Sequence, residues 1–343
     1  MAVLEVRGLT KHFGDIRALD GVDLATREGE FLAILGPSGC GKSTLMRLIA
    51  GLERPSAGDV LVNGEVITPL PPRARNIAMV FQSYALYPHM SVASNIAFPL
   101  KARGVGKAER EERIRWAAAA LGIEALLQRR PARLSGGEKQ KVALARALVR
   151  KPSLFIFDEP LSSLDAQVRA RARAELRQLH QRTGVTTIYV THDQVEAMGL
   201  GNRVAVMRLG KLRQLGAPQE LYNEPADTFV AGFIGTPPMN LLEHGKIIIG
   251  FRPEHLLPRA AVPDGNDFVA FQVRITQTEY LGSEWLAYGS LDGGFGDSKV
   301  LCKLQQSAIE KVKVGEIQEF AVARAQLRFF DKETGLRTAP VPF

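Results

Sequence analysis

Hydrophobic and polar residues alternate with two different periods along the first two thirds of the chain. Short apolar runs bounded by turn residues predict buried strands. The predicted strands fall within residues 3–35, 57–81, 153–157, 186–190 and 204–207. Residues 88–150 and 165–182 instead show helical spacing, and Glu109 lies one turn before Arg113, which supports a helix. Helices that alternate with apolar strands predict an α/β fold with a mostly parallel sheet covered on both faces.

The pattern changes character at residues 235–238, which read Gly-Thr-Pro-Pro. Beyond them helical spacing is rare, and residues 269–275 alternate apolar with polar positions, as strands with one buried face do. We therefore predict two domains. The first spans residues 1–235 and includes a helical subdomain at about 88–150, and the second is a small all-β domain of residues 236–343.

A glycine-rich loop follows the apolar run 31–35 and precedes a segment with helical spacing. It consists of Gly36, Pro37, Ser38, Gly39, Cys40, Gly41, Lys42, Ser43 and Thr44. Glycines let backbone N–H groups wrap around an anion, and the following helix N-terminus adds partial positive charge. In this spacing Lys42 would reach the β- and γ-phosphates of a nucleotide, and Ser43 would ligate Mg²⁺. The same surroundings predict a lowered thiol pKa for Cys40.

Two carboxylates follow the apolar run 154–157. Because parallel strands end at one edge of a sheet, Asp158 and Glu159 are expected to lie beside the glycine-rich loop. Asp158 would hold Mg²⁺ through water, and Glu159 would polarise the water that attacks the terminal phosphate. Loop and carboxylates together predict hydrolysis of a nucleoside triphosphate.

The composition of the chain limits where the protein can be located in the cell and which classes of partner it can bind. No apolar run approaches the 18 or more residues of a membrane helix, and the N-terminus shows no signal pattern, so we expect a cytoplasmic protein. The two cysteines, Cys40 and Cys302, fit a reducing compartment. Net charge is +8, and the densest basic stretch places Arg169, Arg173 and Arg177 on one helix face. We interpret that face as solvated, and without interleaved aromatic residues it does not predict nucleic-acid binding.

A serine–glycine motif then points to one family. Alone, Ser135 followed by Glu138 reads as a helix cap. Before a helix and Asp158-Glu159, however, the stretch resembles the signature motif of ABC-type ATPases, formed here by Ser135, Gly136, Gly137 and Glu138. Further family marks follow in order. Phe13 lies at the position of the aromatic ring that stacks on adenine, and Gln82 matches the glutamine that senses Mg²⁺ and contacts the membrane partner. Asp165 belongs to the Ser162–Asp165 loop, which matches the loop that crosses the dimer interface. His192 matches the switch histidine at the γ-phosphate.

The resemblance covers nearly the whole chain and is closest to carbohydrate-importer ATPases of the maltose and glycerol-phosphate type. It implies a P-loop NTPase domain followed by an OB-like (TOBE) regulatory domain. It also implies that two copies, or two closely related subunits, sandwich two ATP molecules with Mg²⁺ between the phosphate loop of one and the signature motif of the other. The implied partners are two membrane-spanning permease subunits and an external solute-binding protein, with the ATPase peripheral on the cytoplasmic face of the membrane.

Two positions depart from the family pattern. Glu138 replaces the usual glutamine, and its carboxylate is expected to face the ribose. The segment between Asn240 and Gly250 is short where the family normally fits another strand pair, so we expect the regulatory domain to lack that hairpin.

Other functions remain open at this stage. An importer ATPase for a polyamine, an anion or a metal would carry the same motifs. An ATPase of DNA repair or chromosome structure would place a long coiled coil between Gln82 and the signature, where only about fifty residues without heptads lie. A translation factor of the superfamily would carry two cassettes, and this chain has one.

Overall fold

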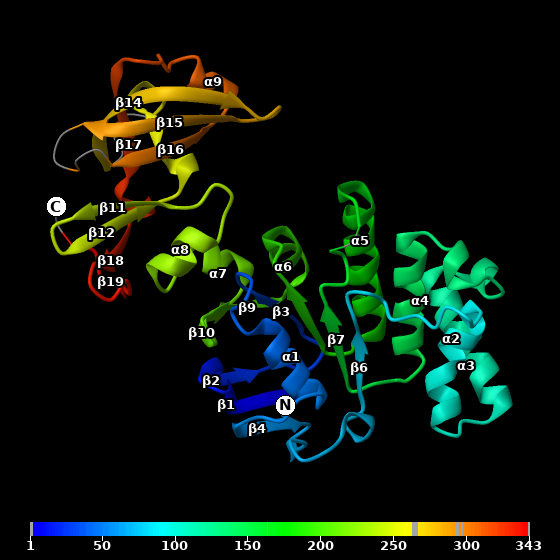
Figure 1. Cartoon of the computed structure of the whole chain (residues 1–343). Coiled ribbons are helices and arrows are strands. Elements are labelled where there is room, and N and C mark those ends of the chain that lie inside the picture. Colours follow the sequence, from blue (N-terminus) through cyan, green and yellow to red (C-terminus); the bar gives the residue numbers. More distant parts are fainter. Residues whose placement is uncertain (1–2, 163, 263–266, 293–294, 296–297, 342–343) are drawn as a thin grey trace. The chain divides into compact units, whose positions relative to one another are not determined.

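The computed structural model describes residues 3–162, 164–262, 267–292, 295 and 298–341. The chain divides into two compact units, Met1–Pro218 and Gln219–Phe343, and each is described by itself (Figure 1). Residues 219–235 belong to the C-terminal compact unit, whereas the sequence pattern predicts them in the first domain.

A six-stranded sheet forms the centre of the first unit, in the order β10-β9-β3-β8-β7-β6. Its strands are β3 (Phe31–Leu35), β6 (Ile77–Val80), β7 (Leu154–Asp158), β8 (Thr187–Thr191), β9 (Arg203–Arg208) and β10 (Lys211–Gly216). All neighbours are parallel except β10, which runs antiparallel to β9. Every residue of β3 and β8 is buried, as expected of strands covered on both faces. The predicted mostly parallel sheet is confirmed.

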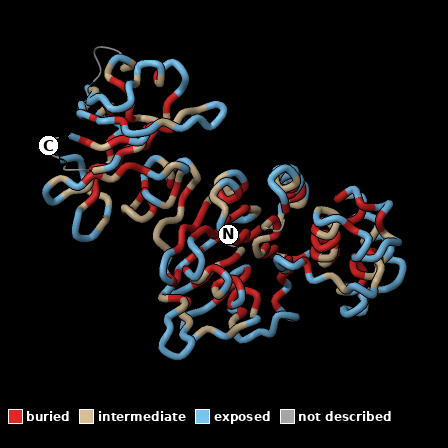
Figure 2. The backbone as a smooth tube through the Cα atoms, turned by 45° about the horizontal axis from the view of Figure 1, so that its top comes forward, coloured by how far each residue is buried: buried red, intermediate tan, exposed pale blue. Residues whose placement is uncertain are grey.

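Alternate residues of these strands enter two separate cores. Phe31, Phe157 and Tyr189 pack with helices on one face, whereas Leu32 and Ile188 pack on the other. The helices that follow the strands are α1 (Lys42–Ala50), α5 (Ala166–Thr183) and α6 (Gln194–Leu200). Figure 2 shows the resulting buried segments running along the strands, with exposed segments at the loops between them.

Two smaller layers complete the first unit. An antiparallel sheet, ordered β2-β1-β4-β5, consists of β1 (Leu4–Phe13), β2 (Ile16–Ala25), β4 (Ala57–Val62) and β5 (Glu65–Val66). A group of helices lies within the predicted helical stretch and consists of α2 (Val92–Ala102), α3 (Lys107–Leu121) and α4 (Gly136–Leu148). Glu109 and Arg113 form the expected ion pair on α3. Among the described residues, every helix falls short of the length and hydrophobicity needed to cross a bilayer.

Strands dominate the second unit. After α7 (Pro218–Asn223) and α8 (Thr228–Phe233), a sheet in the order β11-β12-β18-β19 and another in the order β13-β17-β14-β15-β16 enclose one hydrophobic core. The strands are β11 (Asn240–His244), β12 (Ile247–Phe251), β13 (Leu257–Pro258), β14 (Phe268–Tyr280), β15 (Trp285–Asp292), β16 (Lys299–Leu304), β17 (Ile317–Ala323), β18 (Arg328–Asp331) and β19 (Arg337–Thr338). The short segment between Asn240 and Gly250 forms an antiparallel hairpin of β11 with β12. That the domain lacks a further hairpin found in the family stays a prediction.

Candidate functional site

The glycine-rich loop joins β3 to α1 and has room only for glycine at two places. Gly41 has a φ of 104°, and a Cβ there would lie 2.6 Å from the carbonyl oxygen of Ala18. A Cβ on Gly36 would lie 2.5 Å from the carbonyl oxygen of Met207. Both distances are shorter than real Cβ contacts, so the loop can pass this close to its neighbours only without side chains. The loop is the compact anion cradle that the motif predicts.

Lys42 is folded into this loop. Its side chain is buried, and Nζ donates to the carbonyl oxygens of Gly36 at 2.7 Å and Pro37 at 3.0 Å. Lys42 carries no carboxylate partner among the described residues. Its charge is therefore balanced here by loop carbonyls, which a phosphate group would outcompete as an acceptor.

The thiol of Cys40 lies inside the same loop, 3.8 Å from Lys42 Nζ. Burial raises the pKa of the Cys40 thiol more than the Lys42 charge lowers it. The predicted lowering of this pKa is therefore wrong, because the sequence could not show that the thiol is only 3% exposed.

Asp158 and Glu159 follow the buried part of β7, as predicted. Burial, with the adjacent Glu159 carboxylate, raises the pKa of Asp158, while the charges of Arg47 and Lys42 lower it. α1, which begins at Lys42, packs against β7, which ends at Asp158. Glu159 has a φ of 45°, an uncommon value for a residue with a side chain, and its N–H donates to the carbonyl of Val190 at 2.9 Å.

His192 joins this group from the neighbouring strand. It follows β8, which lies between β3 and β7, and its Nδ1 is 3.0 Å from Oε2 of Glu159. Its side chain is half exposed. The three strands thus deliver the loop lysine, the two carboxylates and the imidazole to one edge of the sheet. That arrangement can bind a triphosphate and direct a base at a water beside it.

The loop that precedes α5 is tied to this edge. Ser162 Oγ donates to the carbonyl of Glu159 at 2.9 Å, and Asp165 caps α5 by accepting from the N–H of Val168 at 3.0 Å. Ser163, also in this predicted interface loop, lies outside the described residues. The loop geometry is thereby coupled to the backbone of Glu159.

The signature-like turn begins α4. Ser135 Oγ accepts from the N–H of Glu138 at 3.3 Å, and Glu138 Oε2 accepts from the N–H of Ser135 at 2.7 Å, so the predicted cap is a complete capping box. The hydrogen bond from Ser135 lowers the pKa of Glu138. The carboxylate thus serves its own helix in this structure. Gly136 lies against the interface loop, since a Cβ there would be 3.2 Å from Leu164 Cδ2.

Two predicted residues lie apart from the cluster. Phe13 is 47% exposed at the end of β1, with Lys11 Nζ 4.7 Å from its ring centroid, so one ring face can receive a planar group. Gln82 is exposed just after β6. Neither position contradicts the predicted contacts, and the roles of both residues stay predictions.

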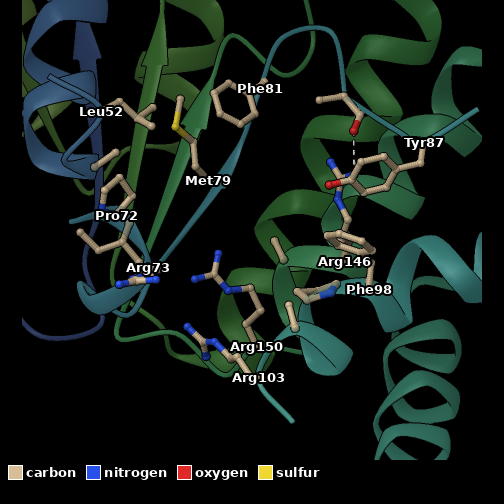
Figure 3. A pocket seen from close by; sticks show the side chains of 16 residues that line it. Leu52, Pro72, Arg73, Met79, Phe81, Tyr87, Phe98, Arg103, Arg146 and Arg150 are labelled. Carbon is tan, nitrogen blue, oxygen red and sulfur yellow. Dashed lines mark hydrogen bonds between the residues drawn. The ribbon is translucent and has the colours of Figure 1, made fainter. Parts of the chain in front are cut away.

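A groove that the sequence did not reveal lies beside Gln82. Its volume is about 700 Å³. Leu52, Met79, Phe81 and Phe98 form apolar walls, and Figure 3 shows Arg73, Arg103 and Arg150 pointing into its lower part. Arg146 is fixed in the wall by donating to the carbonyls of Tyr84 and Ala85, each at 2.7 Å. The aromatic residues Phe81 and Phe98 were the one signal of this groove in the sequence. Only the fold shows that both are exposed and line the same groove.

Comparisons with known proteins agree with this geometry. A family model described as ABC transporter matches residues 19–162. The sn-glycerol-3-phosphate import ATP-binding protein UgpC of Cupriavidus pinatubonensis is 44% identical over 377 residues, covering 98% of this chain and 99% of the relative. The protein of the same name from Ruegeria pomeroyi is 45% identical over 361 residues, covering 99% and 100%.

Solved structures match about two thirds of this chain. The structure of cbiO1 from Clostridium perfringens, part of the ABC transporter complex cbiONQ, aligns with a TM-score of 0.60 at 30% identity, covering 65% of this chain and 91% of that one. The dimeric ATP-binding cassette MJ0796, bound to ADP and Pi in a post-hydrolysis state, aligns with a TM-score of 0.56 at 31% identity, covering 63% and 98%.

Proposed function

This chain belongs to the family of ABC transporter ATP-binding proteins, and from that premise we propose that it is the ATP-hydrolysing subunit of an importer for sn-glycerol-3-phosphate or a related carbohydrate. One observation carries the proposal. Lys42, Asp158, Glu159 and His192 converge at one sheet edge in a chain that is similar over its whole length to import ATP-binding proteins.

The chain's own residues divide the work at this edge. The loop N–H groups and Lys42 bind the phosphates, and Phe13 stacks on the adenine. Glu159 accepts a proton from the attacking water, and His192, which contacts Glu159 in this structure, holds that carboxylate and reaches the γ-phosphate. The raised pKa of Asp158 fits a buried carboxylate whose negative charge is neutralised by a bound cation.

The donor set suits Mg²⁺. Ser43, Gln82 and Asp158 offer hydroxyl, amide and carboxylate oxygens, which are the hard ligands this ion prefers. Within the described residues no group of three or more His, Cys, Asp or Glu side chains forms a protein-only metal cage. Mg²⁺ needs no such cage, because it binds through few side chains together with phosphates and water. When bound, the ion would neutralise charge that develops on the phosphates.

Two copies of the chain complete the nucleotide site. In the proposed dimer, Ser135 and the N–H groups of Gly136 and Gly137 face the γ-phosphate held by the partner's loop. The start of α4 suits this role, because its first N–H groups point outward at a helix N-terminus. Asp165 lies in the loop that crosses between the copies.

We infer that the groove beside Gln82 receives a segment of a permease subunit on the cytoplasmic face of the membrane. Its apolar walls include Phe81 and Phe98, which are 37% and 39% exposed and would gain from being covered. The permeases and an external solute-binding protein would then carry the solute, and no nucleic acid is involved. The C-terminal unit, whose larger sheet has five strands, would be the OB-like (TOBE) regulatory domain.

Transport by the assembled complex tests this function. The chain would be purified with the permease subunits of its transporter, placed in liposomes with their solute-binding protein, and supplied with ATP inside. We expect ATP-dependent uptake of labelled sn-glycerol-3-phosphate, with maltose and spermidine as competitors. Inhibition by spermidine alone would favour the non-sugar importer instead, and ATP hydrolysis without any permease association would overturn the importer assignment.

A further inference from the structure

A buried polar network lies behind the loop that carries His192. Glu196 of α6 is 2% exposed, and its Oε2 accepts hydrogen bonds from the hydroxyls of Tyr189 and Thr191, each at 2.8 Å. Both hydroxyl residues belong to β8, just before His192. A carboxylate this deeply buried needs a nearby positive charge, because removing an anion from water is costly.

Arg169 of α5 supplies that charge. Its Nε lies 4.0 Å from Glu196 Oε1, and its Nη1 donates to Oδ2 of Asp193 at 3.4 Å. Asp193 follows His192 directly and caps α6 by accepting from the N–H of Val195 at 2.7 Å. Arg169 therefore restrains the backbone around His192. Its Nε is buried without a hydrogen-bond partner in the part of the chain that the structure describes, so a slightly closer Glu196 would complete the network.

The same guanidinium fixes the interface loop. Its Nη2 donates to the carbonyl of Leu164 at 2.9 Å. The Leu164 side chain in turn lies against the signature turn, at the 3.2 Å approach to Gly136 given above. Arg169 is thus connected through Leu164 to the turn that serves the partner's nucleotide. Through Asp193 it is connected to the loop that serves the chain's own nucleotide.

We propose that Arg169 is a positioning residue that couples the two ATP sites of the dimer. The proposal rests on the proposed function, in which His192 and the signature turn act on different nucleotides. When the partner's ATP seats the signature turn, Leu164 is held, Arg169 tightens on Asp193 and Glu196, and His192 is set for hydrolysis of the second ATP. An arginine suits this task because its planar fork can hold several acceptors at fixed angles.

The decisive experiment compares Arg169→Gln with Arg171→Gln, an exposed arginine on the same helix, in the assembled transporter. ATP hydrolysis is measured against ATP concentration. For Arg169→Gln we expect kcat to fall by about ten- to a hundred-fold, since a misplacement of about 1 Å can have that effect. KM should change less than about three-fold. We expect a Hill coefficient above 1 in the unaltered transporter and a fall to about 1 in Arg169→Gln. Arg171→Gln should match the unaltered transporter.

A second pair of variants tests the network itself. Glu196→Gln keeps an acceptor for Tyr189 and Thr191 but removes the charge that faces Arg169. We expect it to lower kcat and cooperativity as Arg169→Gln does, and the double variant should be no worse than the poorer single one. Additive losses, or full kcat and cooperativity in a folded Arg169→Gln, would overturn the coupling. If Arg169→Gln fails to fold, Glu196→Gln decides by the same Hill coefficient.

Reference variants separate this proposal from the proposed function. His192→Ala and Glu159→Gln are measured beside the others. If they retain hydrolysis, the assignment of the site is wrong. If they lose it while Arg169→Gln keeps its cooperativity, the site stands and the coupling alone is wrong.

Discussion

Nδ1 of His192 lies 3.0 Å from Oε2 of Glu159, although 32 residues separate them in the chain. The contact follows from the sheet, because β7 and β8 are parallel neighbours and pair Asp158 with Val190. Each functional residue is found immediately after its strand ends. The imidazole and the carboxylate are therefore set in place by backbone hydrogen bonds before any nucleotide arrives, which spares the site that reorganisation during the reaction.

Glu159→Gln should remove hydrolysis while ATP binding stays intact. An amide has the shape of the carboxylate but cannot take a proton from water, so the rate should fall by about 10²- to 10⁴-fold. The variant should also accumulate as an ATP-bound dimer. Steady-state ATPase rates and equilibrium ATP binding check this, with the exposed Glu28→Gln as the matched control. Steady-state hydrolysis at the unaltered rate would rule out a base at this position.

Cys40 should be labelled slowly by a maleimide at neutral pH. Burial raises its pKa, and a raised pKa means that less of the reactive thiolate exists at a given pH. The rate should increase as the pH rises towards that pKa and should jump when the protein is unfolded in urea. Mass spectrometry of a Cys302→Ser variant follows Cys40 alone. Fast labelling at pH 7 that MgATP blocks would instead support the low pKa expected from the sequence.

Much of the central fold could be predicted because its strands are buried on both faces. Residues 31–35 and 154–157 read as continuous apolar runs, and the carboxylates Asp158 and Glu159 come directly after the second. Because β3, β8 and β7 are parallel, the residues that follow them meet at one edge of the sheet. These apolar runs are local features of the sequence, so they can be recognised without knowing which distant residues are in contact.

The features that the sequence missed depend on contacts across long chain separations. Arg169 looked like part of a solvated helix face, yet it is 32% exposed and holds Asp193, which lies 24 positions later. The burial of Cys40 likewise depends on how closely distant backbone packs over the loop. Helical periodicity cannot show which arginine on a basic helix face lies next to a buried carboxylate.

Arg252→Met should destabilise the C-terminal unit. Arg252 is 2% exposed, and it donates through Nε to the carbonyl of Tyr222 at 3.1 Å and through Nη1 to that of Ala231 at 3.1 Å. Its guanidinium also lies 3.9 Å from the Tyr222 ring centroid. Methionine would remove these hydrogen bonds and leave the Ala231 carbonyl only the N–H of Met239 at 3.4 Å, so we expect a loss of about 2–4 kcal/mol in the free energy of unfolding.

Fluorescence of a single tryptophan can follow that loss in the full chain. Trp116→Phe leaves Trp285, which lies on β15 of the C-terminal unit, as the only reporter. Urea midpoints of the Arg252→Met variant are compared with those of Arg274→Met, which removes an exposed arginine from β14. Equal midpoints for the two variants would show that the buried guanidinium adds no stability.

Glu138→Gln should keep most of the ATPase activity of the assembled transporter. The carboxylate of Glu138 closes the capping box by accepting from the N–H of Ser135, and a glutamine carbonyl can accept the same hydrogen bond. The substitution loses the attraction to the charge of Lys141 and to Arg129 Nη1 at 3.9 Å, the latter a partly exposed pair worth at most about 1 kcal/mol. Glu138→Ala, which cannot close the box, should destabilise the start of α4 by about 1 kcal/mol. Ser135→Arg should abolish hydrolysis, because a long cation would occupy the surface that we propose to meet the partner's nucleotide. Steady-state ATPase rates of the three variants check this order, and a collapse of activity in Glu138→Gln would show that the carboxylate acts beyond its own helix.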